Sequence, residues 1–250
     1  MTEPALRMPV PRIIAVEDSF IVIDKPAGLI CHRDGRTREP SVAEWVADTY
    51  PEMREVGDAW VSPQGEVIPV SGLVHRLDRT TSGVVVAART QAAYEYLKGE
   101  FKARRVEKEY RAFAYGHVTA EHGRIVAEIV RSSTPPKRWS ARPCDEHDPR
   151  AAITEWRVLA RGADIGTPFS YLSLAPKTGR THQIRVHCAH MGHPIVADHL
   201  YAPEYPRILG FTRPALHAYA IAFTREDGTR AAFEAPLPED FVRGSTSTGE

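Results

Sequence analysis

The feature that most constrains the fold is a polar segment followed at once by a run of valines. Residues 72–83, Gly-Leu-Val-His-Arg-Leu-Asp-Arg-Thr-Thr-Ser-Gly, precede Val84-Val85-Val86-Ala87-Ala88. A short apolar run that is rich in β-branched residues and bounded by polar ones is typical of a buried strand. The polar segment is therefore predicted to be a loop that leads into this strand and places Asp78 at the edge of a sheet.

Two arginines flank Asp78, at positions 76 and 79. Nearby guanidinium groups favour an ionised carboxylate, which suits a nucleophile or an electrostatic stabiliser better than an acid. An isolated Asp–Arg pair is more often structural, with the carboxylate bonded to its own backbone and to the hydroxyl groups of residues 80–82. The residues alone leave both interpretations open.

Length and cysteine content limit the class of protein. A chain of 250 residues, 42% of them hydrophobic, suffices for one globular domain. We expect it over residues 1–242, with a disordered tail at 243–250. The three separated cysteines favour neither a disulfide framework nor a zinc site and fit a reducing cytoplasm. The sequence has no signal peptide and no apolar run near the ~18 residues of a membrane span, so we expect a cytoplasmic protein without a membrane partner.

Charge is unevenly distributed although the formal net charge is zero. Residues 75–197 carry 20 Lys and Arg against 12 Asp and Glu. A neutral molecule can present a basic face, and phosphate binding depends on the local field. The uneven distribution is compatible with a polyanionic partner, and equally with charges that are simply solvated.

Hydrophobic periodicity predicts mixed secondary structure. A capping box at Ser41 and Glu44 begins a helix that ends near Pro51, and Thr90 caps a helix whose apolar side is Ala93, Tyr96, Leu97 and Phe101. A third helical stretch ends near Gly192. Residues 54–69 and 131–142 are predicted loops. Strands are predicted at 13–16, 20–24, 84–88, 109–116, 123–130, 151–159, 169–175, 215–224 and 230–235.

The string His-Arg-Leu-Asp-x-x-Thr-Ser-Gly at 75–83 resembles the signature of RNA pseudouridine synthases of the RluA and RsuA type. The turn Lys-Pro-Ala-Gly at 25–28 resembles the opening motif of that family. About a dozen residues precede Ile13, where the resemblance begins, so we expect none of the N-terminal RNA-binding (S4) modules that related members carry. Further matches occur at 108–112, 137–139, 176–187, 216–218 and 235–238, so the resemblance extends from about Ile13 to about Phe241.

The resemblance implies roles for individual residues. Asp78 is the expected catalytic residue, Tyr110 is expected to contact the target base and help to move a proton, and Arg185 is expected to pair with Asp78. Arg76 is expected to fill the space that a flipped nucleotide leaves. Without the motif, Tyr110 is more typical of a core tyrosine in an alternating strand. The expected RNA-binding residues are Arg76, Arg79, Lys108, Lys137, Arg138, Arg180 and His182.

The implied fold is α+β, with a mostly antiparallel sheet and flanking helices around a central RNA-binding cleft. The implied activity is cofactor-free isomerisation of a uridine in ribosomal or transfer RNA by a monomeric enzyme. The spacing of His182, His187, His190 and His193 argues against a zinc site. The family usually has glycine where this chain has Ala197 and Ala202, so the turn there is expected to close differently.

Two alternatives remain open at this stage. One is an RNA-binding protein of the same fold that lacks activity, and the other is an enzyme that cleaves a free nucleoside or nucleotide. Retention of Asp78, Tyr110 and Arg185 argues against the first. The second predicts no loss of rate at high salt, whereas RNA binding weakens steeply with salt.

Overall fold

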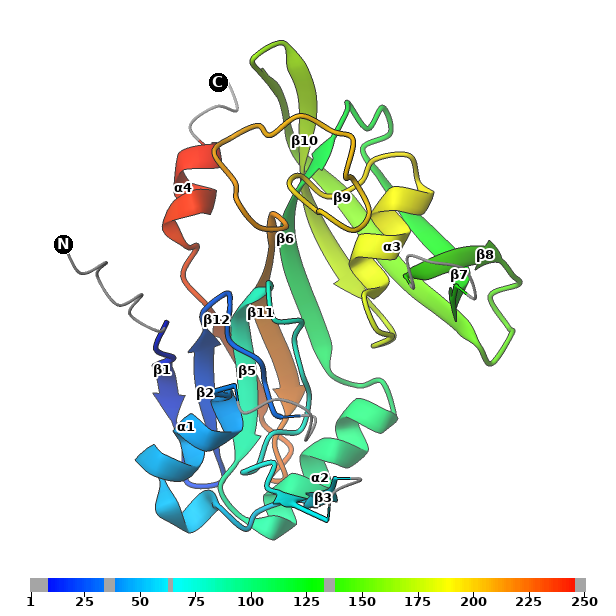
Figure 1. Cartoon of the computed structure of the whole chain (residues 1–250). Helices are drawn as coiled ribbons and strands as arrows, with labels where there is room; N and C mark the ends of the chain where they lie inside the picture. Colours follow the sequence, from blue (N-terminus) through cyan, green and yellow to red (C-terminus); the bar gives the residue numbers. More distant parts are fainter. Residues whose placement is uncertain (1–8, 34–38, 63–64, 133–137, 246–250) are drawn as a thin grey trace, which may run out of the picture. The chain divides into compact units, whose positions relative to one another are not determined.

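The structure, a computed structural model, describes residues 9–33, 39–62, 65–132 and 138–245 (Figure 1). Its internal contacts divide the chain into two compact units, Met1–Ala103 and Arg104–Glu250. We refer to them as the N-terminal and the C-terminal unit. The expectation of a single catalytic domain over residues 1–242 stays a prediction.

The N-terminal unit contains an antiparallel sheet in the order β1 (Arg12–Val16), β2 (Phe20–Lys25) and β5 (Ser82–Ala88). Every residue of β5 is buried, which explains why its sequence is a continuous apolar run and does not alternate. The helices are α1 (Val42–Thr49), the 3-10 turn η1 (Pro51–Met53) and α2 (Gln91–Lys102), which packs against β5. The predicted strands and helices of this unit are therefore present.

Both predicted helix caps form. The Ser41 hydroxyl accepts a hydrogen bond from the Glu44 backbone N–H at 3.2 Å, and Thr90 does the same for Ala93 at 3.2 Å. Each cap satisfies a backbone donor that the first helical turn leaves without an internal partner. On the predicted apolar side of α2, Ala93 and Leu97 are buried, whereas Tyr96 and Phe101 are only partly so, and the prediction omitted the buried Tyr94.

The predicted loop 54–69 contains a small antiparallel hairpin, with strands β3 (Trp60–Val61) and β4 (Val67–Ile68). Strands of two residues are too short to show an alternating pattern. Trp60, Val61 and Val67 are exposed on this hairpin. These apolar residues therefore belong to an exposed hairpin and not to a helix or to a strand of the core.

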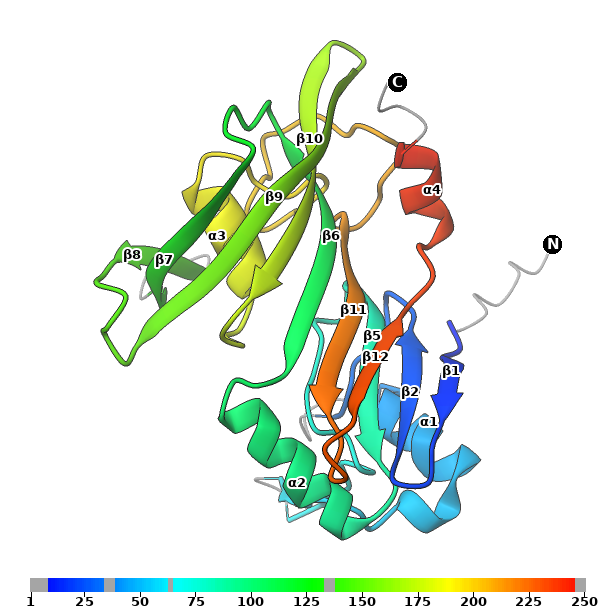
Figure 2. The ribbon, with the colours of Figure 1, turned by 180° about the vertical axis from the view of Figure 1, so that it is seen from behind.

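The C-terminal unit has an antiparallel sheet in the order β12-β11-β6-β10-β9-β7-β8 (Figure 2). Helix α3 (Gln183–His190) packs on one face, against β7, β8, β9 and β10. The mixed helical and antiparallel structure of the two units confirms the predicted α+β class. The strands are β6 (Glu107–Tyr115), β7 (His122–Arg131), β8 (Trp139–Pro143), β9 (Ala151–Asp164), β10 (Thr167–Pro176), β11 (Leu216–Thr224) and β12 (Arg230–Glu234).

Phenylalanines form the centre of this unit's core. Phe113 of β6 lies with its ring centroid 5.5 to 5.7 Å from those of Phe169, Phe211 and Phe241, all of them buried. Tilted and edge-on aromatic pairs at these separations add to the energy of burying apolar area. Phe241 belongs to α4 (Glu239–Ser245), so this final helix is attached to the sheet by the aromatic cluster.

Three features of the C-terminal unit differ from expectation. The predicted strands 151–159 and 169–175 extend to Asp164 and begin at Thr167, and their hairpin turns at residues 165 and 166, both left-handed at φ 48° and 74°. The predicted loop 131–142 contains the strand β8, which is defined by pairing with β7. Residues 243–245 of the expected tail belong to α4, and 246–250 lie outside the described residues. Among the described residues, no helix has the length and apolar character needed to cross a membrane.

Candidate active site

A tight turn in the N-terminal unit begins the loop that carries Asp78. Gly72 has a left-handed φ of 75°, and a Cβ built on it would lie 2.0 Å from the Ala88 carbonyl oxygen. Its own carbonyl accepts the Ala88 N–H at 2.8 Å. A residue with a side chain would have to push the chain away from β5. Glycine is therefore required where this loop meets the valine strand.

The backbone is anchored on both sides of Asp78. On one side, the Leu77 N–H donates to the Cys31 sulfur at 3.2 Å, and the Cys31 thiol donates to the Leu77 carbonyl at 3.6 Å. On the other, the Arg79 carbonyl accepts from the Gly28 N–H at 2.8 Å and from the Lys25 ammonium at 3.2 Å. The segment 25–31 thus holds the catalytic candidate's backbone in place.

Lys25 is completely buried. Besides the Arg79 carbonyl, its Nζ donates to the carbonyls of Pro26 at 2.9 Å and Leu29 at 2.7 Å. A buried ammonium group is stable only when its donors are satisfied, and these three carbonyls meet that need. Sequence reasoning treated 25–28 as a turn motif and missed the lysine, although the lysine was the one charged residue in it.

The three charged residues of the loop differ in exposure. Asp78 is half-buried, and Arg76 and Arg79 are exposed. The Arg79 guanidinium forms an ion pair with Glu39 of the same unit. Burial lowers the pKa of the His32 imidazole, and the positive charge of Arg76 lowers it further. Arg79 is thus partly neutralised by an acid that sequence reasoning did not consider.

In the C-terminal unit, Tyr110 lies on β6 opposite Leu174 of β10 and Ala218 of β11, and it is half-buried. Lys108 projects from the same face of β6, because it precedes Tyr110 by two residues. Burial lowers the pKa of Lys108, and the charges of Arg104 and Lys177 lower it further. A half-buried ammonium group among other cations favours an anionic ligand, which agrees with the expected RNA contact.

The motif at 176–187 is held by the buried side chain of Gln183. Its Oε1 accepts from the Thr178 hydroxyl at 2.7 Å and from the Arg180 N–H at 3.0 Å. Its Nε2 donates to the Ile153 carbonyl at 2.9 Å and to the Thr154 hydroxyl at 3.0 Å. The first two contacts tie the loop to the start of α3, and the other two connect it to β9, so the first turn of α3 has a defined position. Arg180 remains exposed.

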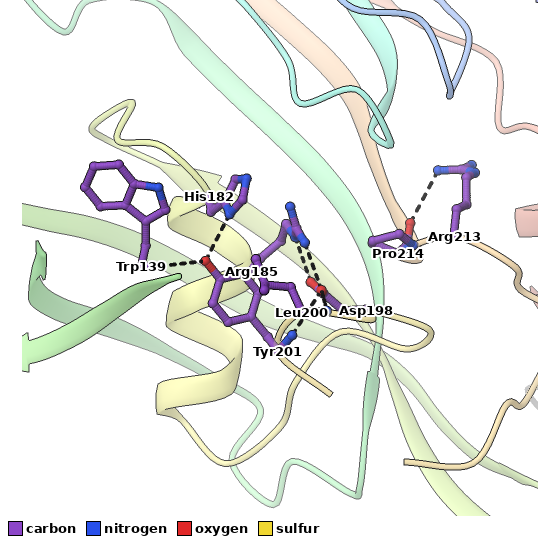
Figure 3. A network of polar contacts seen from close by, with 8 residues as sticks. All are labelled: Trp139, His182, Arg185, Asp198, Leu200, Tyr201, Arg213 and Pro214. Carbon is purple, nitrogen blue, oxygen red and sulfur yellow. Dashed lines mark hydrogen bonds and ion pairs between the residues drawn. The ribbon is translucent and has the colours of Figure 1, made fainter. Parts of the chain in front are cut away.

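Arg185 is buried in a network that Figure 3 shows. Its Nε and Nη2 donate to the two carboxylate oxygens of Asp198 at 2.7 and 2.8 Å. Its guanidinium carbon lies 5.1 Å from the centre of the Tyr201 ring. The Tyr201 hydroxyl accepts the Trp139 backbone N–H at 3.3 Å and lies 2.9 Å from Nδ1 of His182. The structure thus brings together Arg185 and His182, two of the predicted residues.

Asp198 is the partner of Arg185 that sequence reasoning missed. The bonds to Asp198 use two of the five N–H donors of the guanidinium group. The predicted pairing of Arg185 with Asp78 stays a prediction. Among the other predicted residues, Arg138 is exposed and Lys137 lies outside the described residues. The described residues contain no cluster of His, Cys, Asp and Glu that would hold a metal ion.

The alanine at position 197 occupies a strained turn. Ala197 is buried at a left-handed φ of 58°, and its N–H donates to the Tyr115 hydroxyl at 3.2 Å. The hydroxyl in turn donates to the Pro206 carbonyl at 2.7 Å. Ala202 has no left-handed φ. The turn therefore adopts the left-handed conformation that glycine favours at Ala197 and not at Ala202.

We expect Ala197→Gly to stabilise the protein by about 0.5 to 1 kcal/mol. The left-handed conformation costs an alanine about 1 to 2 kcal/mol, and the greater freedom of glycine in the unfolded chain offsets part of the gain. Urea denaturation measures the change. Ala202→Gly is the matched control and should destabilise, since it removes a buried methyl group and adds unfolded-state freedom without relieving a left-handed conformation. A loss of stability in Ala197→Gly would contradict the strain.

His187 is a buried imidazole that is neutral in the folded protein. Its Nδ1 lies 2.9 Å from the Thr154 hydroxyl, and burial, with a smaller effect of His190, lowers its pKa to about 4. The pKa of His187 in the folded protein lies below the ordinary value of 6.5. The unfolded chain therefore binds a proton at this residue more tightly than the folded protein does, and it takes up that proton as pH falls below 6.5. Protonation therefore favours unfolding between about pH 6.5 and 4.

We expect the unfolding free energy to fall by about 2 kcal/mol per such histidine between pH 7.5 and pH 5. His217 contributes in the same direction, since burial also lowers its pKa to about 4. Urea denaturation at the two pH values gives the dependence, and His187→Asn should reduce it. An identical pH dependence in the variant would show that His187 is not buried as a neutral group.

Comparison with known proteins identifies the family. Residues 19–190 match the family model of RNA pseudouridylate synthases. The chain belongs to this family. It is 34% identical to "Ribosomal large subunit pseudouridine synthase D" of Yersinia pestis over 93% of this chain and 69% of that protein. The protein of the same name from Neisseria meningitidis serogroup B is 35% identical, over 91% of this chain and 58% of its own length.

Two solved human structures are similar to this pseudouridine synthase. "RNA Pseudouridylate Synthase Domain Containing 1" has a TM-score of 0.71 at 27% identity, covering 95% of this chain and 87% of its own. "RNA Pseudouridylate Synthase Domain Containing 4" has a TM-score of 0.69 at 22% identity, covering 94% and 92%, and supports the fold. The chain is therefore an isomerase that converts uridine in RNA to pseudouridine. The family match includes Asp78, Tyr110 and Arg185 and ends before Asp198.

Proposed function

We propose that this enzyme isomerises a uridine of large-subunit ribosomal RNA, with Asp78 as its catalytic residue. The RNA class is supported by the names of the relatives from Yersinia pestis and Neisseria meningitidis. Sequence reasoning had left transfer RNA equally open. The observation that carries the residue assignment is the anchoring of the backbone on both sides of Asp78 by Lys25, Gly28 and Cys31.

The reaction breaks the bond between N1 of uracil and C1′ of ribose, turns the base, and forms a bond from C5 to C1′. The proton on C5 is lost, and N1 ends with a proton, so the product is an isomer of the substrate. A base stacked in a helix is out of reach, so the nucleotide must be flipped, at a cost of a few kcal/mol. Contacts to the RNA backbone must offset that cost.

In this proposal the Asp78 carboxylate assists departure of the base, by attack at C6 or at the sugar. A half-buried carboxylate on an anchored loop suits this role, since it is accessible and has little freedom to move. Tyr110 contacts the base and helps to move the proton. Arg185 pairs with Asp78 in this proposal. Arg76 fills the space left by the nucleotide.

RNA binding is proposed to use exposed cations of both units. Arg76, Arg138 and Arg180 are exposed, and Arg79 is held partly by Glu39. Lys108 and His182 are half-buried and supply contacts nearer to the target nucleotide. Neutralising several phosphates makes affinity fall steeply with salt, by roughly 0.7 to 0.9 log units per phosphate for each tenfold increase.

The test is tritium release from RNA labelled at C5 of uridine, because formation of the new bond expels that hydrogen. A large-subunit ribosomal RNA transcript should release tritium, and a transfer RNA pool should not. Release from transfer RNA alone would overturn the proposed substrate. Equal, salt-independent activity on free uridine monophosphate would support the free-nucleotide alternative. Binding without release would support an inactive RNA-binding protein.

A further inference from the structure

The C-terminal unit contains two similar Arg–Asp pairs. Arg185 and Asp198 form one, and Arg213 forms the other with Asp240 at 2.8 and 3.0 Å. Both arginines also lie over an aromatic ring, at 5.1 Å for Arg185 and 5.8 Å for Arg213. The Arg213–Asp240 pair can therefore serve as a control that shows how much an Arg–Asp pair of this kind contributes to stability alone.

Asp198 is fully buried and satisfied on both oxygens. Oδ2 accepts from Arg185, while Oδ1 accepts from Arg185 and from the backbone N–H groups of Leu200 and Tyr201 at 3.1 and 3.2 Å. Charge-assisted bidentate bonds fix the plane of a guanidinium group as well as its position. The turn that carries Asp198 and the orientation of Arg185 thus depend on each other.

Tyr201 extends this arrangement to two further elements. Its ring covers the Arg185 guanidinium, and its hydroxyl bonds the Trp139 N–H at the start of β8 and the His182 ring. Figure 3 shows the hydroxyl between Trp139 and His182, with Arg185 beside the ring. One side chain therefore joins the arginine, the beginning of α3 and the strand that follows Arg138.

His182 is held in a conformation that costs energy. It stands at the N-terminus of α3 with φ 56° and makes no side-chain capping bond to the helix. Its ring is directed to Tyr201 at 2.9 Å. A non-glycine residue in the left-handed region costs roughly 1 to 3 kcal/mol and is retained where surrounding contacts enforce it. Here the Tyr201 hydroxyl is such a contact.

We propose that Asp198 and Tyr201 are positioning residues for the isomerisation: they set Arg185 and His182 in register with the start of β8. The inference rests on the proposed role of Arg185 in the reaction. RNA held by Arg138, the residue before β8, is then kept at a defined distance from the arginine. Neither residue touches the substrate in this proposal.

The decisive variant is Tyr201→Phe, because it removes only the hydroxyl and leaves the ring over Arg185. We expect the single-turnover rate at saturating RNA to fall by about 10- to 100-fold, as small misplacements of catalytic groups do. The dissociation constant for RNA should change less than the rate. Hydrogen exchange of the Trp139 amide should become faster, because its acceptor is lost.

Asp198→Asn and Asp240→Asn form the matched comparison. Each replaces one carboxylate of a bidentate pair and should lower the urea midpoint. Only Asp198→Asn should also lower the single-turnover rate of the folded protein, whereas Asp240→Asn should leave it unchanged. An equal loss of rate in both variants would overturn the proposal, since it would show a general effect of stability.

The outcome is separable from that of the proposed function. If wild-type protein releases no tritium from any RNA, the proposed function fails, whatever the variants do. If wild-type protein is active and Tyr201→Phe speeds exchange at Trp139 without slowing the reaction, Tyr201 is only a structural tie and the positioning role is excluded.

Discussion

Asp78→Asn abolishes pseudouridine formation and leaves folding and RNA binding intact, if Asp78 is the catalytic residue. We expect the rate to fall by at least about 10⁴-fold, as is usual when a residue that acts on the reacting atoms is removed. The fold should persist because the loop is anchored through the backbone of Leu77 and Arg79, and asparagine has nearly the same shape.

Tritium release measures the activity of this variant, and a filter-binding assay at constant salt measures its affinity for RNA. Asp48→Asn is the control, since Asp48 is an exposed carboxylate of the same unit that pairs with Arg54 at the surface. The control should retain full activity. Appreciable tritium release by Asp78→Asn would exclude Asp78 as the catalytic residue.

Lys25→Met lowers both stability and activity, because the buried ammonium group has the Pro26, Leu29 and Arg79 carbonyls as acceptors. Methionine has a similar length and fits the buried space, so the variant isolates the loss of the donors. Leaving buried carbonyls without partners costs about 1 to 3 kcal/mol each, and local relaxation reduces the total. We expect the unfolding free energy to fall by about 2 to 4 kcal/mol.

Activity of Lys25→Met should fall under conditions where the variant is fully folded, because the Arg79 carbonyl next to Asp78 loses one of its two anchors. Single-turnover rates at low temperature, with circular dichroism on the same samples, test this. Lys102→Met at the exposed end of α2 is the control and should change neither quantity. A stable and fully active Lys25→Met protein would show that the ammonium group holds nothing in place.

Together these variants divide the site into a group that reacts and groups that hold it. Asp78 belongs to the first class, and its loss should affect rate alone. Lys25 belongs to the second, and its loss should affect stability and rate together. The two variants therefore distinguish a catalytic loop from a purely structural one. If the loop were purely structural, both the Asp78 and the Lys25 variant would lose stability.

Elements with strong local signals were predictable from the sequence. The valine run of β5, the capping box of α1, the Thr90 cap of α2 and the alternating strands of the large antiparallel sheet follow from side-chain periodicity and hydrogen bonding within a few residues. The motif around Asp78 also predicted the family correctly. These properties depend on neighbours in the chain, so the order of residues was enough to determine them.

What only the tertiary structure decided was the pairing of groups far apart in sequence. Lys25 reaches the Arg79 carbonyl across 54 residues, and the Tyr201 hydroxyl reaches Trp139 across 62. Arg185 has Asp198 as its buried partner, and β8 exists because β7 lies beside it. A side chain or a short strand of this kind has no local pattern that names its partner. Its partner is determined by packing, because burial removes water and leaves each polar group dependent on whichever group the fold places next to it.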